Sequence, residues 1–253
     1  MPHNLLSSLM AHGYAEQHPE TGNYRLGPGA LQLANRFLAN CDLRELAMPL
    51  LDALHTTLDE WVVLSMLRAG REFNVASIQS GRSLVVNPNG LGTGDRFGFD
   101  PNDGLHCTAV GKVLLSSLDP AEMDALLRSH SWPQRTPQTI TNPEALRREV
   151  ALVRVRGYAI NVEEHYEGLR AVAAPVYDAT ARITASLGVA YPTLRATPAR
   201  EEEIALAVRR TAAELSLRLG YTPAAETLAS LTGRHAEEPA RTAEPLMILG
   251  GIA

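Results

Sequence analysis

The sequence predicts an α+β protein in which a short helix, a hairpin and a helical connector precede a larger sheet domain. Three observations predict this order. Apolar residues recur at helical spacing near the start, two further helical stretches follow, and after residue 58 strand signals outnumber helical signals without strict alternation. We therefore divide the chain into four parts, residues 1–27, 28–58, 59–221 and 222–253.

The first part combines one helix with one hairpin. Leucine and methionine side chains recur at helical spacing over residues 3–12, and Gly13 is a typical stop signal. Residues 14–26 place two short strand-like segments around a polar turn that contains Pro19 and Gly22. A helix followed by such a hairpin indicates a fragment of a winged-helix unit.

The charge of this first region does not favour DNA binding. Arg25 and Arg36 are balanced by Glu16 and Glu20, so residues 1–40 carry no net charge. Affinity for DNA depends strongly on neutralising phosphates. On charge alone, a hairpin that serves packing is favoured over one that contacts DNA.

The connector, residues 28–58, is predicted as two helical stretches. Asp42, with Glu45 three residues later, forms a capping-box pattern at the start of the second stretch, and Pro49 inside it predicts a kink. Leucines follow one face of both stretches, namely Leu31, Leu38, Leu46, Leu50 and Leu54. One short wing cannot cover this face, so we expect a homodimer.

The third part, residues 59–221, alternates strand and helix signals. Strand signals run over 62–68, 72–79, 158–162, 171–178 and 183–191. Asp119-Pro120, Asn142-Pro143 and Thr197-Pro198 each place a capping residue before a proline that opens a helix. Residues 87–104 are rich in glycine and asparagine and predict a loop, and residues 222–253 lose periodicity and predict a disordered tail.

Composition excludes several classes of protein. The chain of 253 residues is 45% hydrophobic and 20% charged, with a net charge of −5, which does not fit a chain coated in nucleic acid. It contains neither eighteen consecutive apolar residues nor a signal peptide, so we expect a cytoplasmic protein without a membrane partner. Its two cysteines, Cys41 and Cys107, are expected to be reduced thiols.

Two segments of the third part contain residue types found in catalytic or cofactor sites. Gly104 to Lys112 resembles a phosphate-binding loop, but six residues rather than four separate its glycines. A thiol nucleophile at Cys107 needs an imidazole across space, which its neighbour His106 cannot supply, so burial of the thiol is favoured. No nucleophile elbow or metalloprotease motif occurs, and we expect neither an enzyme nor a bound cofactor.

A metal site is the remaining alternative for the polar residues of this part. Glu163, Glu164 and His165 have the ligand types of a metal site when combined with His106 and Cys107. Their spacing matches no zinc motif, so solvated loop charges are favoured and no metal is expected.

Several segments taken together resemble the IclR family of bacterial transcription regulators. The resemblance runs in order from about residue 2 to 221, through LLSSLMAHGY, NYRLGPGALQLA, DLRELAMPLLDALHTTLDEWVVL, LHCTAVGKVLL, TITNPEALRREVALVRVRGYAINVEEHYEGLRAVAAPV and LGVAYPTLR. The resemblance implies a winged helix-turn-helix, a linker helix and a GAF-like effector domain. It also implies that dimers, or dimers of dimers, bind double-stranded DNA and a small organic or aromatic acid.

The chain departs from the family pattern at its start. The helices that usually precede the recognition helix are absent, and Met1 falls inside that helix. Either a longer reading frame begins upstream, or the chain is a regulator that has lost DNA binding. The positions that the resemblance assigns to DNA contact are His3, Asn4, Ser7, Ser8 and Arg25, with Asn4 where an arginine is usual.

The resemblance also assigns an effector pocket. Its lining would be His106, Thr108, Ala109, Asn161, Ala171, Gly188 and Ala190. Thr108 and Ala109 precede a helix whose N-terminal amides can hold a carboxylate, although Thr108 can equally serve as an ordinary helix cap. Serines are common in the family at positions 188 and 190, and their absence favours a larger acid over a two- or three-carbon oxoacid.

The sequence therefore predicts an effector-responsive transcriptional regulator. A small acid bound in the third part would alter how two linker helices pair and thereby change the spacing of two DNA-reading elements. The alternative is a sensing or scaffolding module that has lost DNA binding.

Overall fold

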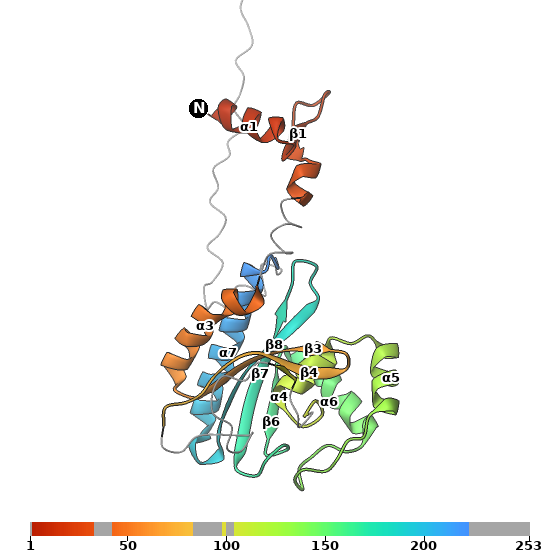
Figure 1. Ribbon diagram of the computed structural model, residues 1–253, viewed down its shortest axis with the longest axis vertical. Helices are drawn as coiled ribbons and strands as arrows, with labels where there is room; N and C mark the ends of the chain where they lie inside the picture. The colour runs from red at the N-terminus through yellow and green to blue at the C-terminus, as the bar shows by residue number, and fades with distance from the viewer. Residues whose placement is uncertain (1, 33–41, 83–97, 100–103, 223–253) are drawn as a thin grey trace, which may run out of the picture.

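The computed structural model describes residues 2–32, 42–82, 98–99 and 104–222. The first of these segments contains helix α1 (Pro2–Ala11) and the antiparallel strands β1 (Ala15–Gln17) and β2 (Tyr24–Leu26) (Figure 1). The predicted helix and hairpin are therefore confirmed. The predicted tail lies outside the described residues.

Glycines join α1 to the hairpin. Gly13 has a φ of 70°, a left-handed conformation that ends α1 at low cost only for glycine. A Cβ atom on Gly27 would lie 2.3 Å from the carbonyl oxygen of Gly13, so the chain leaving β2 passes directly against this turn. The close approach fixes the hairpin beside the end of the helix.

Helix α3 (Leu43–Leu58) forms the second half of the predicted connector. Asp42 caps it as expected, but its side chain accepts a hydrogen bond from the amide of Arg44, so the capping box predicted with Glu45 is not the cap observed. Pro49 lies within α3, and the helix continues through it. Of the first stretch, residues 28–32 are helical and the remainder lies outside the described residues.

The predicted dimer face is partly used within the chain itself. Leu54 is buried in the core, and Leu46 and Leu50 pack partly against the same core, because this side of α3 contacts the long C-terminal helix. Leu31 is 66% exposed, and Leu38 lies outside the described residues. Part of this leucine face is therefore covered within the chain itself, and the expected homodimer stays a prediction.

A six-stranded antiparallel sheet forms the centre of the third part. Its strands are β3 (Trp61–Arg68), β4 (Arg71–Ile78), β5 (Gly98–Phe99), β6 (Ala159–Val162), β7 (Leu169–Tyr177) and β8 (Ile183–Pro192). They lie in the order β5-β4-β3-β8-β7-β6, so the first hairpin and the last strands meet between β3 and β8. The α+β fold class is confirmed. The short strand β5, which pairs with β4, lies inside the segment that was predicted as a loop.

Helices cover both faces of this sheet (Figure 1). Helices α3 and α7 (Pro198–Arg218) lie together on one face. The opposite face is covered by α4 (Ala109–Ser116), α5 (Pro120–Ser129) and α6 (Pro143–Arg156), and a short 3-10 helix, η1 (Thr193–Arg195), follows β8. The capping residues before Pro120, Pro143 and Pro198 act as predicted.

Each face of the sheet has its own apolar core, because successive strand residues point to opposite sides. Along β3, Val62 and Leu64 join the core under α3 and α7, whereas Val63 joins the core under α4 to α6. Every residue of α4 is buried. This arrangement places the N-terminus of α4 directly on the sheet.

No helix in the described part of the chain is both long and apolar enough to cross a membrane.

Candidate functional site

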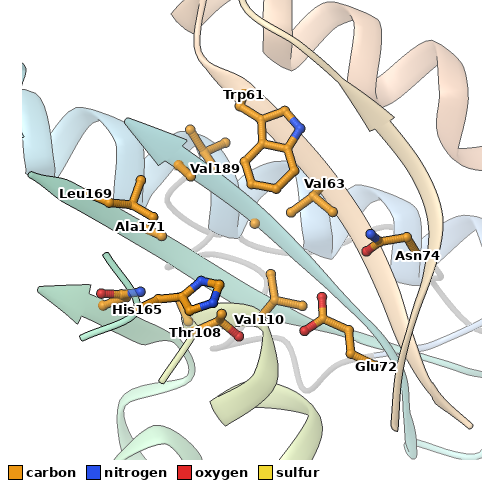
Figure 2. A pocket seen from close by; sticks show the side chains of 14 residues that line it. Trp61, Val63, Glu72, Asn74, Thr108, Val110, His165, Leu169, Ala171 and Val189 are labelled. Atoms are coloured by element: carbon orange, nitrogen blue, oxygen red, sulfur yellow. The ribbon is translucent and has the colours of Figure 1, made fainter. Parts of the chain in front are cut away.

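A cavity of about 50 Å³ lies between the first turn of α4 and the sheet (Figure 2). Its walls come from β3, β4, β6, β7 and β8, from the start of α4 and from the β6–β7 loop. The lining residues are Trp61, Val63, Glu72, Asn74, Thr108, Ala109, Val110, Asn161, His165, Leu169, Ala171, Gly188, Val189 and Ala190. Apolar side chains predominate, and polar groups are confined to a few positions.

Six of the seven predicted pocket residues lie at this cavity: Thr108, Ala109, Asn161, Ala171, Gly188 and Ala190. Strand register explains why Ala171, Gly188 and Ala190 meet. Ala190 pairs with Ala171 on one side, and Gly188 pairs with Val63 on the other, so small residues of adjacent strands share one face. Small side chains leave room between the sheet and α4. A Cβ atom on Gly188 would lie only 2.6 Å from Cγ2 of Val110.

The first turn of α4 presents hydrogen-bond donors to the cavity. Thr108 is the N-cap, and its hydroxyl oxygen accepts a hydrogen bond of 2.9 Å from the amide of Gly111. Ala109 and Val110 both line the cavity, and their amides donate to none of the residues that the structure describes. Unused amides at a helix N-terminus attract anions through their partial positive charge. The capping role of Thr108 is thus present, and the amides of Ala109 and Val110 stay without an acceptor among the described residues.

Asn161 forms hydrogen bonds to two segments at one end of the cavity. Its Nδ2 donates to the carbonyl oxygen of Cys107 at 2.8 Å, and its Oδ1 accepts from the amide of Glu164 at 3.0 Å. The side chain therefore ties β6 both to the residue before the N-cap of α4 and to the β6–β7 loop. That loop carries His165, whose ring packs against Tyr166 and lines the cavity.

A buried ion pair holds the same loop against α4. Nζ of Lys112 donates to Oε1 of Glu164 at 2.6 Å and to the carbonyl oxygen of Ile160 at 3.0 Å. Burial raises the pKa of Glu164 above its usual value of 4.5, while the adjacent Lys112 acts in the opposite direction. The hydroxyls of Thr136 and Thr139 donate to carbonyl oxygens of the loop.

The sequence-based prediction for this loop is therefore wrong in part. Glu164 and His165 are buried, not solvated, because Lys112 neutralises the carboxylate and the two threonines hold the backbone. Glu163 instead accepts a hydrogen bond from Thr193 at 2.9 Å. Within the described ranges, no group of three potential metal ligands is positioned to hold an ion.

His106 is the predicted pocket residue that does not line the cavity. Its Nε2 lies 3.0 Å from the carbonyl oxygen of Pro133, and its ring meets Trp132 edge to face, so the side chain points toward the segment after α5. Its neighbour Cys107 is buried and free, as expected. Burial raises the pKa of the Cys107 thiol to about 12, so the nucleophilic thiolate is not available.

Sequence reasoning did not find the β3–β4 side of the cavity, nor several lining residues on α4, β7, β8 and the β6–β7 loop. The residues missed are Trp61, Val63, Glu72, Asn74, Val110, His165, Leu169 and Val189. Alternation along each strand could have suggested Trp61 with Val63 and Glu72 with Asn74 as pairs that share a face. It could not have shown that this hairpin lies beside β8.

The positions predicted to contact DNA lie in the first described segment. His3 and Asn4 belong to α1, and Ser7 and Ser8 are exposed on the same helix. Arg25, on β2, forms an ion pair with Glu16 on β1, with 2.8 Å between nitrogen and oxygen. The guanidinium group predicted for DNA contact thus has a carboxylate partner within the hairpin.

Comparison with known proteins identifies relatives over most of the chain. Residues 35–217 match the family model "Bacterial transcriptional regulator IclR C-terminal". The chain is 32% identical over 219 residues to the HTH-type transcriptional regulator XynR of Escherichia coli, covering 87% of this chain and 83% of that protein.

Solved structures agree with this match. A putative IclR transcriptional regulator from Silicibacter has a TM-score of 0.74 at 29% identity, covering 88% of this chain and 84% of that one. An IclR homologue from Microbacterium hydrocarbonoxydans, solved in complex with 4-hydroxybenzoate, has a TM-score of 0.60 at 24% identity, covering 86% and 84%. At that identity the second likeness shows the fold alone.

Proposed function

The chain belongs to the IclR family of bacterial transcriptional regulators, which are not enzymes, and we propose that it responds to a small organic acid bound beside α4. The observation that carries this proposal is the pairing of two unused amides, at Ala109 and Val110, with a mostly apolar cavity. A carboxylate fits the amides, and its carbon chain fits the apolar wall. The Microbacterium homologue, which shares the fold, was itself solved with a carboxylic acid of this class.

The cavity favours a short acid with an apolar body. A cavity of about 150 Å³ holds a benzene ring, and the present volume of about 50 Å³ is smaller. An acid of four or five carbons therefore enters with less rearrangement of the lining side chains than a benzoate. Two- and three-carbon oxoacids lack partners at Gly188 and Ala190, where the wall has no hydroxyl group. The expected preference for an acid larger than a two- or three-carbon oxoacid is thus kept, and the cavity volume limits how large that acid is.

Regulation by this acid would act through DNA-bound dimers. Binding beside α4 favours one arrangement of the effector domain, and two connectors of a dimer would transmit it to two DNA-contacting segments. Exposed Leu31 and Leu5 are apolar surface that a partner subunit would cover. Sedimentation velocity at micromolar concentration tests the dimer, and a species of 27.4 kDa alone contradicts it.

One observation favours a second function, a sensing module that does not contact DNA. The Arg25–Glu16 ion pair neutralises a cation that the DNA-binding function requires. Gel-shift titration against a pool of duplex DNA distinguishes the two functions. Sequence-specific retention supports the regulator, and retention equal to that of an acidic control protein supports the module.

The effector site is tested by thermal shift with a panel of acids. We expect butyrate and pentanoate to raise the melting temperature more than glyoxylate or pyruvate, because the wall is apolar. Gly188→Leu, which fills the cavity, should abolish the shift, and Gly81→Ala should retain it because a Cβ there meets nothing within 4 Å. Equal shifts in wild type and Gly188→Leu would contradict the site.

A further inference from the structure

The short helix η1 lies between the walls of the cavity and the end of α3. It follows β8, the strand that contributes Gly188 and Ala190 to the cavity. None of its three residues is buried, and Leu194 at its centre is 88% exposed. Hydrogen bonds and an ion pair at its two ends therefore hold η1 in place. An element with few buried apolar contacts moves at a lower cost than one packed into a core.

One end of η1 is bonded to the β6–β7 loop. The hydroxyl of Thr193 donates to Oε1 of Glu163 at 2.9 Å, and the amide of Thr193 donates to the carbonyl oxygen of Gly168 at 2.8 Å. The same loop carries His165, which lines the cavity (Figure 2). Two hydrogen bonds therefore join this wall of the cavity to η1.

The other end of η1 is bonded to the segment between α3 and β3. Nε and Nη2 of Arg195 donate to the two carboxylate oxygens of Glu60, at 2.7 and 2.6 Å. The Glu60 side chain is only 1% exposed, and a bidentate pair of this kind fixes the relative orientation of its two members. Glu60 directly precedes Trp61, which lines the cavity from β3 (Figure 2).

The same segment holds the last turn of α3. A ring nitrogen of His55 lies 3.0 Å from the carbonyl oxygen of Glu60. Arg200, on α7, donates to the carbonyl oxygen of Leu58 at 2.6 Å. Asp59, which joins α3 to β3, has a φ of 50°, a conformation that is uncommon outside glycine. A displacement of Glu60 therefore changes the contacts that hold the end of α3.

The size of the cavity explains why an acid would displace η1. At about 50 Å³ the cavity is smaller than the roughly 150 Å³ that holds a benzene ring, so an acid enters with some rearrangement of the lining. The strands are packed against apolar cores on both faces of the sheet, whereas polar contacts hold the β6–β7 loop. The loop, and η1 with it, is therefore the wall that moves at the lowest cost.

We infer that η1 is a relay that transmits occupancy of the acid site to α3, the second half of the connector. The inference rests on the proposed function, since it assumes that an acid binds the cavity. Thr193 and Arg195 are positioning residues in this relay. Neither lines the cavity, and each acts through a carboxylate partner, Glu163 or Glu60.

Hydrogen-exchange mass spectrometry on the full chain, with and without saturating pentanoate, tests the relay. In the wild type, pentanoate should change the exchange rate of amides in the last turn of α3 by about fivefold or more, the lower end of coupling between two sites. Isothermal titration calorimetry measures the affinity for pentanoate in the same samples. A wild type that binds pentanoate without a change in α3 would overturn the inference and leave the effector site standing.

Thr193→Val tests the end of η1 that reaches the β6–β7 loop. The substitution removes the hydroxyl that donates to Glu163 and keeps the shape of the side chain. Affinity for pentanoate should stay within about threefold of wild type, while the change in α3 falls to about twofold or less. Thr211→Val, a matched change whose hydroxyl donates within α7, should retain both the affinity and the response. A response of wild-type size in Thr193→Val would overturn the inference.

A double variant tests the end of η1 that reaches α3. Replacing Arg195 alone leaves the buried Glu60 carboxylate without its bidentate partner, so Glu60→Gln is combined with Arg195→Gln. The double variant should bind pentanoate with wild-type affinity and lose the response of α3. A response of wild-type size here would also overturn the inference, because the ion pair would then not carry it.

The remaining outcomes separate the relay from the function on which it rests. Loss of pentanoate binding in a variant whose melting temperature matches that of wild type would place the replaced residues in the acid site and overturn the inference. Failure of the wild type to bind either butyrate or pentanoate would overturn both the relay and the effector site.

Discussion

The ammonium group of Lys112 lies 2.6 Å from a carboxylate oxygen of Glu164, and this contact joins α4 to the loop that carries His165. Lys112 is the only lysine in the chain, and its side chain is 1% exposed. It lies on the helix whose first turn presents amides to the cavity. The pair therefore positions both sides of the α4 end of the site.

Removing one member of this pair should destabilise the protein strongly. Lys112→Met leaves the Glu164 carboxylate buried without its cation, which costs about 3–5 kcal/mol in comparable cases. The free energy of unfolding, measured by urea denaturation, should fall by that amount. Arg218→Met, which breaks an exposed pair with Glu214, should change it by less than about 1 kcal/mol.

The double variant separates lost charge pairing from lost packing. In Lys112→Met with Glu164→Gln, no charge remains uncompensated, so we expect part of the stability to return. If the double variant loses as much free energy of unfolding as the two single variants lose together, the broken ion pair is not the cause of the instability.

Gly188 should control the space between β8 and α4. Gly188→Ala places a Cβ atom 2.6 Å from the Val110 side chain, which should cost about 1–3 kcal/mol of stability and weaken acid binding. Adding Val110→Ala removes the clash, and the double variant should be more stable than Gly188→Ala alone. Urea denaturation of the three variants measures this coupling, and strict additivity of their effects would argue against the contact.

Asp178 should make the β7–β8 turn sensitive to acid. Partial burial raises the pKa of Asp178, but hydrogen bonds donated by Thr180 and Arg182 lower it to a net value below 3.8. A depressed carboxylate pKa stabilises the fold above the unfolded pKa, and that stability is lost as the pH falls through the folded pKa. Asp178→Ala should therefore cost about 1 kcal/mol at pH 7 and less at about pH 3. A difference that is constant with pH in denaturation curves would contradict this.

The hairpin ion pair predicts a change in DNA affinity. Glu16→Gln releases Arg25 from its carboxylate partner, so retention on duplex DNA at low salt should increase if the hairpin contacts phosphates. Arg25→Gln should lower retention about equally for all sequences, because a phosphate contact carries no base information. Fluorescence anisotropy measures both, and unchanged affinity in both variants would place the hairpin away from DNA.

The sequence predicted most elements because their signals are local. Asp119 before Pro120 and Gly157 at a positive φ mark helix ends through short-range geometry. The place of Glu72 in the lining of the cavity was not predictable in this way, because it depends on the pairing of β3 with β8. Lys112 was equally hidden, since its burial depends on a carboxylate 52 residues later in the chain. The prediction that His106 lines the cavity was wrong, because its ring points to the carbonyl oxygen of Pro133.

Binding of an acid at the first turn of α4 can be followed at the atoms concerned by an amide NMR titration. Isotope-labelled protein should be titrated with butyrate and with pentanoate. We expect the amide signals of Ala109 and Val110 to shift most and to saturate together, because a carboxylate accepts hydrogen bonds from both. Saturable shifts confined to other regions, with these two signals unchanged, would contradict it.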